Sequence, residues 1–253
     1  MIDFWVQFDK SYRFFSQFCD SDDWHLILKA VAGAVIEYAG NPSCQISILD
    51  VGSGNGVASQ TLCEQIYSRT RCFPSLSVIE NSSMAQDRLK SNILFSSDCG
   101  PLKYATERAE KLPSDFKVDA ILFLHSTYYI DEINKLLKKL VDTHLRPGGA
   151  VIVLVLPEQS PFFLDLPRLD NCSDAIETMF KTMNLETHSF TFQSRFLFPK
   201  GGEFDDNELD LLRKFFMQNS GSTTEFKNRL NDYKNRNGEI DFQDHLLIGK
   251  KNA

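Results

Sequence analysis

The segment with the clearest chemical signature is a glycine-rich turn after an apolar run. Its sequence is Asp50-Val-Gly-Ser-Gly-Asn-Gly56, and a helical pattern begins directly after it. Glycine adopts positive φ and lets a backbone approach a ligand without a Cβ in the way. The N-terminus of the next helix has unpaired N–H groups. The pattern therefore predicts a cofactor-binding loop, with Gly52, Ser53, Gly54 and Gly56 in contact with the cofactor.

The spacing of the glycines indicates which cofactor the loop takes. A dinucleotide loop needs G-x-G-x-x-G, whose third glycine would fall at Val57. This chain has G-x-G-x-G after an acid, the form that binds S-adenosylmethionine, and Asp50 is expected to orient the loop or the ammonium end of the cofactor. Glu80 ends the next predicted strand, where a carboxylate can accept both hydroxyls of a ribose. Nicotinamide enzymes also use such an acid, so Glu80 predicts a ribose without deciding between the two cofactors.

Polar and aromatic residues follow a later apolar strand. His125 and Ser126 end it, and Tyr128 and Tyr129 come next. Ligands of open α/β sheets bind at the carboxyl edge of the strands. Aromatic faces there can hold an amine through cation–π contact, so both tyrosines are expected to line the substrate site. His125 could act as a base or fill a hydrogen-bonded structural role.

The elements that must position these residues alternate between strand and helix. Apolar runs and helical spacing predict strands at 46–51, 76–80, 102–105, 118–124 and 150–156, and helices at 23–38, 57–69, 82–94 and from Asp131 to the turn at 146–149. This order favours a parallel sheet with right-handed crossovers. Further along, the patterns predict helices at 173–184 and 205–217, an alternating stretch at 187–198 and a strand at 240–250.

Chain length and net charge limit the classes of function that the sequence can have. The 253 residues suit one domain, and the net charge of −7 argues against nucleic acid and anionic membranes as partners. The longest apolar run, 150–156, is too short to span a membrane, and the start lacks a signal-peptide pattern. The cysteines and histidines show no metal-binding spacing, so no metal is expected. We therefore expect a cytoplasmic monomer with reduced thiols.

Taken together, several stretches resemble the class I S-adenosylmethionine-dependent methyltransferases. They are the glycine loop, Glu80, the strand at 118–124 and Leu145-Arg-Pro-Gly-Gly149, within a region of strong resemblance at about 40–160. Within this class the chain is most similar to the histamine N-methyltransferases. The stretches that carry this similarity are Ser11-Tyr-Arg-Phe-Phe15, Val78-Ile-Glu80 with Asn81-Ser-Ser, Thr127-Tyr-Tyr-Ile130 and Phe242-Gln-Asp-His-Leu246.

The resemblance implies an α/β, Rossmann-like fold. Its seven-stranded, mostly parallel sheet would have helices on both faces and an antiparallel last strand at 240–250. A single methyltransferase domain would cover 1–253, with a helical cover at 1–40, a cofactor-binding core at 40–156 and a substrate-side insertion with closing strands at 157–253. Thr106 would lie near the adenine, and His125 and Ser126 would border the methionine part of the cofactor.

The resemblance also implies direct in-line methyl transfer from S-adenosylmethionine to a small amine or imidazole-type substrate. Histamine methyltransferases hold their substrate with a glutamate near the N-terminus and an asparagine near the C-terminus. This sequence departs from that pattern with Asp23 (or Asp22) and Asp244 (or Gln243). A carboxylate at 244 favours a cationic substrate and puts histamine itself in doubt. Because the sulfonium already activates the methyl carbon, alignment and desolvation carry the reaction, and no catalytic residue is singled out.

Two other functions remain open at this point. A protein substrate is one alternative, and a catalytically silent S-adenosylmethionine-binding scaffold is the other. The tetrapeptide typical of nucleic-acid amino methyltransferases is replaced by His125-Ser-Thr-Tyr128. The intact loop and Glu80 argue against decay of the cofactor site.

Overall fold

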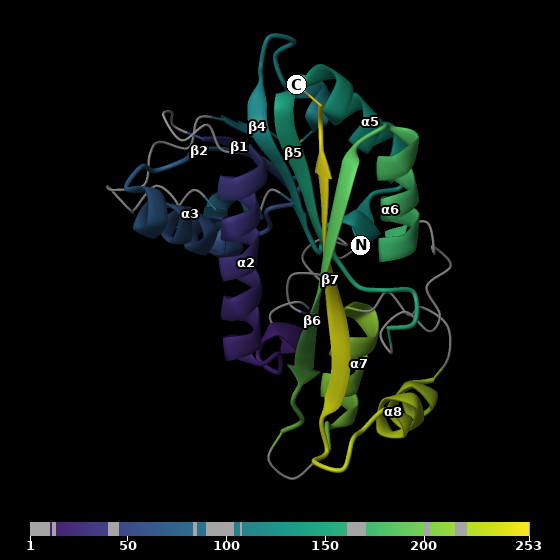
Figure 1. Cartoon of the computed structure of the whole chain (residues 1–253). Helices are drawn as coiled ribbons and strands as arrows, with labels where there is room; N and C mark the ends of the chain where they lie inside the picture. The colour runs from purple at the N-terminus through teal and green to yellow at the C-terminus, as the bar shows by residue number, and fades with distance from the viewer. Residues whose placement is uncertain are drawn as a thin grey trace.

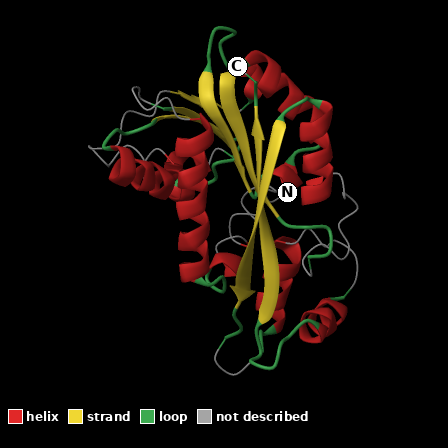
Figure 2. Ribbon diagram, in the orientation of Figure 1, coloured by secondary structure: helices red, strands yellow, loops and turns green. Residues whose placement is uncertain are grey.

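The described residues form one seven-stranded sheet in the order β3-β2-β1-β4-β5-β7-β6 (Figures 1 and 2). The computed structural model describes residues 11, 14–39, 46–82, 85–89, 104–106, 108–160, 171–199, 203–215 and 222–252. The strands are β1 (Ser47–Val51), β2 (Ser75–Ile79), β3 (Tyr104–Thr106), β4 (Val118–Leu124), β5 (Leu145–Val155), β6 (Glu186–Phe196) and β7 (Ile240–Lys250). Strand β7 runs antiparallel to both of its neighbours, β5 and β6, and the other pairs among these strands are parallel. This confirms the predicted mostly parallel, Rossmann-like sheet with an antiparallel last strand.

Different helices cover the two faces of the sheet. The α-helices are α2 (Ser21–Ala39), α3 (Val57–Thr70), α5 (Ile133–Thr143), α6 (Ser173–Thr182), α7 (Asp206–Phe215) and α8 (Thr223–Asp232). Successive side chains of a strand point to opposite faces. Accordingly, Ile48 and Leu122 pack with α2 and α3, whereas Leu49 and Phe123 pack with α5 and α6. Both faces are buried, which explains the nearly unbroken apolar runs in β4 and β5.

A third apolar cluster lies beyond the sheet, where the long strands β6 and β7 continue alongside α7 and α8 (Figure 1). Phe196, Phe204 and Phe242 belong to it, and α7 and α8 contribute Leu212, Phe226 and Leu230. This lobe packs around the parts of β6 and β7 that lie past the carboxyl ends of the parallel strands. It thereby brings residues near the C-terminus opposite the glycine loop.

The structure corrects the expected start of one strand. Strand β5 begins at Leu145, earlier than the expected residue 150. The predicted turn at 146–149 is an irregularity within this strand, and the register between β4 and β5 shifts between Val118 and Ala120.

The helices differ from the sequence-based expectations in three details. Helix α5 has Glu132 as its N-cap, in place of the expected Asp131. Helix α8 was not predicted, because it carries few apolar residues. It nevertheless starts with a capping box at Ser222 and Glu225 that is readable in the sequence. The helix expected at 82–94 is described only at 85–89, where it is helical. Within the ranges that the structure describes, no helix is long and apolar enough to cross a membrane.

Candidate functional site

The glycine loop joins β1 to α3. Gly52, Gly54 and Gly56 all have positive φ, of 73°, 57° and 80°. The Gly52 N–H donates to the Ile79 carbonyl at 2.7 Å, and a Cβ at this position would lie 2.5 Å from Cβ of Ser126. No atom lies within 4 Å of where a Cβ on Gly54 would be. Close packing therefore requires glycine at 52, whereas at 54 the backbone borders open space.

Asp50 sits at the end of β1 and is almost fully buried. Its Oδ2 accepts a hydrogen bond from Ser59 Oγ of α3 at 2.5 Å, which ties the strand to the helix across the loop. Within the described ranges, its Oδ1 has no hydrogen-bond partner. Burial raises the pKa of Asp50 from 3.8 to about 6, against the lowering effect of the Ser59 hydrogen bond.

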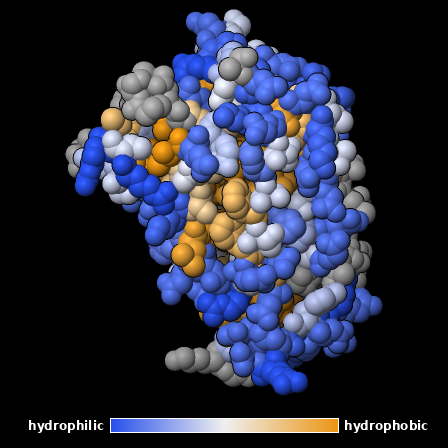
Figure 3. Space-filling model, in the orientation of Figure 1, coloured by the Kyte–Doolittle hydropathy of each residue, from blue (hydrophilic) through white to orange (hydrophobic). Residues whose placement is uncertain are grey.

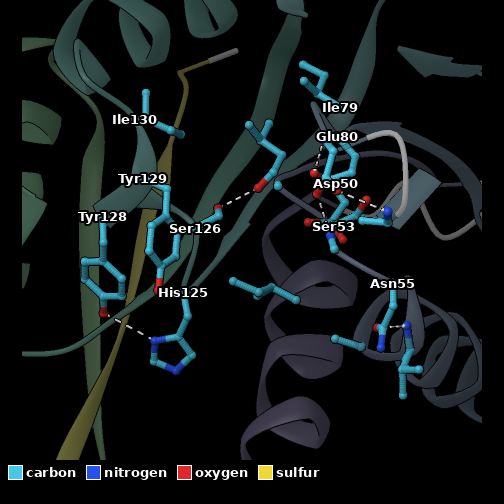
Figure 4. A pocket seen from close by; sticks show the side chains of 18 of the residues that line it. Asp50, Ser53, Asn55, Ile79, Glu80, His125, Ser126, Tyr128, Tyr129 and Ile130 are labelled. Carbon is cyan, nitrogen blue, oxygen red and sulfur yellow. Dashed lines mark hydrogen bonds between the residues drawn. The ribbon is translucent and has the colours of Figure 1, made fainter. Parts of the chain in front are cut away.

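Glu80 follows β2 and faces the same loop (Figure 4). Its Oε2 accepts the Gly54 N–H and its Oε1 accepts the Ser82 N–H, each at 2.8 Å. Burial raises the pKa of Glu80, while these backbone hydrogen bonds lower it. A carboxylate oxygen can accept more than one hydrogen bond, so Glu80 can hold the loop and still accept ribose hydroxyls.

These residues line one cleft of about 940 Å³ that runs from the glycine loop to β6 and β7. The cleft brings together eleven of the thirteen residues that the sequence singled out: Asp23, Asp50, Gly52, Ser53, Gly54, Glu80, His125, Ser126, Tyr128, Tyr129 and Asp244. Gly56, the N-cap of α3, is not among the described residues that line the cleft, and its contact with the cofactor stays a prediction. Thr106 ends β3 opposite Ile79, and its side chain lies outside the described part.

At the far end of the cleft, β7 contributes a buried carboxylate. Phe242 and Asp244 line the cleft, whereas Gln243 between them is exposed on the other side of the strand. Because side chains alternate along the strand, Asp244 and not Gln243 faces the cleft. Asp244 Oδ2 accepts a hydrogen bond from the Ser194 hydroxyl of β6. Its Oδ1 lies 3.2 Å from Nε2 of His125, yet it has no hydrogen-bond partner among the described residues.

His125 lies directly beyond β4 in a conformation that is unusual for a residue with a side chain, with φ of 54°. Its backbone N–H donates to the Leu154 carbonyl at 2.9 Å. Nδ1 lies 3.2 Å from the Tyr128 hydroxyl oxygen, which accepts a hydrogen bond from the Leu156 N–H (Figure 4). Trp24 of α2 stacks on the imidazole, with ring centroids 6.0 Å apart. The ring is therefore held on three sides.

The N-terminal carboxylate lies in a different environment from the one expected. Asp23 lines the cleft, whereas Asp22 is exposed, so the structure favours Asp23 of these two alternatives. However, Arg195 of β6 pairs with Asp23 at 3.2 Å and with Asp20 at 2.5 Å. A carboxylate already neutralised by a guanidinium attracts a cationic ligand less strongly. This ion pair corrects the expectation that Asp23 is a free anchor for a cation.

Sequence reasoning did not find Ser194, Arg195 or Cys19, all of which line the cleft. Ser194 and Arg195 reach it only because β6 pairs with β7 over its whole length. The partners of these residues lie 50 and 172 positions away in the chain. The one available signal, the alternating pattern at 187–198, predicts a strand but not what the strand faces.

The cleft fits a cofactor with an amino-acid part and an adenosine part. Asp50 Oδ1 and Ser53 Oγ are buried and have no hydrogen-bond partner from the residues that the structure describes, and both residues belong to the loop wall. An unpaired buried carboxylate oxygen is costly unless a donor reaches it, and the ammonium group of S-adenosylmethionine is such a donor. In the part of the chain that the structure describes, no group of three His, Cys, Asp or Glu side chains could hold a metal ion.

Residues 49–153 match the family model of a methyltransferase domain, and no curated protein matches the chain. The fold is similar to the YcgJ protein from Bacillus subtilis, with a TM-score of 0.59 and 16% identity over 88% of this chain and 99% of that one. It is also similar to a putative methyltransferase from Bacillus halodurans, with a TM-score of 0.60 and 13% identity over 89% and 99% of the two chains. The plantazolicin methyltransferase BamL, in complex with a triazolic desmethylPZN analog and SAH, gives a TM-score of 0.55 and 14% identity over 95% and 89%. At these identities the likeness shows a shared fold.

Proposed function

We propose that this protein, whose central domain is that of an S-adenosylmethionine-dependent methyltransferase, methylates a nitrogen of a small cationic acceptor of the amine or imidazole type. The observation that carries the proposal is Asp244. It is a buried carboxylate at the acceptor end of the cleft, and one of its oxygens lacks a hydrogen-bond partner in the part of the chain that the structure describes. A buried charge needs a partner, and a cationic ligand supplies one.

The walls around Asp244 support an organic cation over a metal ion. Phe15, Trp24, Tyr128 and Phe242 line this end of the cleft. Aromatic faces attract ammonium and imidazolium groups, and a mainly apolar wall with a few polar groups is typical of small-molecule sites. The cleft must also hold the cofactor, and a volume of about 940 Å³ leaves room for only a small acceptor beside it. This favours a small molecule over a protein side chain presented by a folded partner.

The reaction needs little from the protein beyond alignment. When bound, the cofactor supplies a methyl carbon that is already activated by the sulfonium. The glycine loop and Glu80 would fix the cofactor, and Asp244 would fix the acceptor at the other end of the same cleft. Holding two reactants in line is worth several kcal/mol of the barrier.

Calorimetric titration with S-adenosylhomocysteine is the first test, with NAD as control. Micromolar binding of the former and none of the latter is the expected result. A panel of imidazoles, primary amines and neutral alcohols of similar size, assayed with labelled methyl donor, then tests the acceptor class. Transfer to the alcohols and to none of the cations would refute the proposed specificity.

Asp244→Asn gives a sharper test of the acceptor anchor. Losing a charge-assisted hydrogen bond is worth about 1.5–3 kcal/mol, so KM for a cationic acceptor should rise about tenfold to a hundredfold. The affinity for S-adenosylhomocysteine should stay unchanged. Asp241→Asn is the matched control, because Asp241 lies on the same strand but on its exposed side. An equal rise in KM for a neutral acceptor would show that Asp244 acts only on the structure of the cleft.

A further inference from the structure

The contact between His125 and Asp244 has an unusual geometry. Nε2 of His125 and Oδ1 of Asp244 are 3.2 Å apart, close enough for a hydrogen bond. Among the described residues Oδ1 nevertheless has no hydrogen-bond partner, so an N–H on Nε2 would not point at it. Nε2 and Oδ1 therefore lie side by side without a hydrogen bond between them, and each can accept one when Nε2 carries no proton. The pair is thus built to receive N–H groups from a third molecule.

The other side of the ring allows the imidazole proton to lie on Nδ1. Nδ1 is 3.2 Å from the Tyr128 hydroxyl oxygen. A phenol oxygen can accept hydrogen bonds, so it can take both the Leu156 N–H and a proton on Nδ1. In neutral imidazole one nitrogen carries the proton and the other keeps a lone pair. A proton on Nδ1 leaves a lone pair on Nε2, which can accept a hydrogen bond from a donor that also reaches Asp244 Oδ1.

We propose that His125 is a catalytic residue, the general base that removes a proton from the acceptor nitrogen held between Nε2 and Asp244 Oδ1. Tyr128 is a positioning residue that fixes the tautomer. This inference rests on the proposed function and narrows its acceptor to a protonated primary or secondary amine. Such a nitrogen has at least two N–H groups, one for each of the two facing atoms.

The step conserves charge within the three groups. An ammonium N–H gives its proton to Nε2, and the electron pair of that bond stays on the nitrogen as a lone pair. The lone pair forms the new N–C bond with the methyl carbon, while the electrons of the C–S bond return to sulfur. His125 becomes an imidazolium beside the Asp244 carboxylate. The positive charge thus moves from the amine to His125, and the carboxylate still has a cation next to it. The side chain is 29% exposed, which gives the proton a path to solvent after turnover.

The position of His125 suits this role. The next residue, Ser126, donates from Oγ to the Val51 carbonyl at 2.5 Å and packs against Gly52. The base is thus one residue from the wall that would hold the cofactor. A non-glycine residue at positive φ costs of order 1–3 kcal/mol and persists where its surroundings enforce it. Here that conformation directs the ring into the acceptor end of the cleft.

The charged and titratable groups around His125 come from four elements. Asp244 faces it from β7, Tyr128 and Tyr129 from the turn after β4, and Cys19 lies before α2. Burial raises the pKa of Tyr128, and burial and Asp244 both raise that of Cys19, so both groups stay protonated at neutral pH. Arg195, at the rim, is paired with Asp20 and Asp23. Of these described groups, Asp244 is the one whose charge stabilises an imidazolium here.

The tautomer can be tested without any acceptor. Nitrogen-15 NMR of the imidazoles, in the full chain saturated with S-adenosylhomocysteine, should show neutral His125 with its proton on Nδ1. His125→Gln assigns the signal. Tyr128→Phe, which removes the partner of Nδ1, should shift the tautomer population toward Nε2–H. A proton already on Nε2 in the unmodified protein would overturn the inference and leave the proposed function untouched.

Kinetics test the base itself, with a primary amine that the acceptor panel identifies as the probe. His125→Gln should lower kcat about 10²- to 10⁴-fold at pH 7, with KM changed less than about threefold. The difference in kcat between variant and wild type should shrink about tenfold for each unit by which the pH rises toward the amine pKa. The reason is that more of the amine is then already deprotonated and needs no base. His188→Gln, on the edge strand outside the cleft, should behave as wild type. A raised KM with unchanged kcat would show that His125 only binds, and failure of every amine would count against the proposed function.

Discussion

Asp50 shows how one buried atom couples the cofactor site to pH. Its pKa in the fold is about 6, above the ordinary 3.8. Between these two values the folded protein binds more protons than the unfolded chain, so stability falls as pH rises through this range. Above pH 6 the full penalty remains, about 3 kcal/mol for a shift of roughly two units. An ionised Asp50 with an unpaired oxygen is thus a cost that a bound cation can offset.

The substitution Asp50→Asn removes this titration. The free energy of unfolding of the wild type should fall relative to that of the variant by about 2.4 kcal/mol from pH 4 to pH 7. Urea unfolding of the cofactor-free proteins across this range gives the two curves. Their difference is the informative quantity, because burial raises the pKa of Glu80 as well. A constant difference across the range would show that Asp50 does not titrate there.

At the scale of elements, the sequence predicted the parts that are buried on both sides. Strand β4 and strand β7 have the bounds that were expected, 118–124 and 240–250, because apolar runs bounded by polar residues leave little freedom. Helix α8 escaped detection because its stability depends on a capping box and two buried side chains, Phe226 and Leu230, and not on a long apolar stripe. Local patterns also could not show that Arg195 would neutralise Asp23, since only the pairing of distant strands creates that contact.

The glycine loop makes a testable distinction between its own positions. Gly52→Ala would place a Cβ 2.5 Å from Ser126 and add left-handed strain, whereas Gly54→Ala adds the strain alone. We expect Gly54→Ala to cost about 1–2 kcal/mol of stability and to weaken S-adenosylhomocysteine binding, because its methyl group enters the open space of the cleft. Gly52→Ala should cost clearly more stability. Urea unfolding and calorimetry separate the two effects, and equal stability losses would contradict the distinction.

At the scale of the whole molecule, the exposed edge of the sheet bears on the oligomeric state. Strand β6 forms that edge, and an uncovered edge strand can pair with another chain. Residues just before α2 cover its C-terminal end: the Asp20 N–H donates to the Arg195 carbonyl, and the Leu197 N–H donates to the Phe18 carbonyl. Apolar side chains near the crossing of β6 and α2 leave a modest apolar area on this face (Figure 3).

Because the C-terminal end of this edge is covered and the net charge of −7 opposes self-association, we expect a monomer. Sedimentation equilibrium at micromolar concentration should give a mass near 28.9 kDa.

The remaining open part of the edge carries Phe190, which is 47% exposed. A mass twice as large, reduced to that of the monomer by Phe190→Asp, would place a dimer interface on β6. In that arrangement the second subunit would lie along the strand that carries Ser194 and Arg195 into the cleft, so acceptor binding would depend on protein concentration. Constant kinetic parameters over a hundredfold range of enzyme concentration would agree with the monomer.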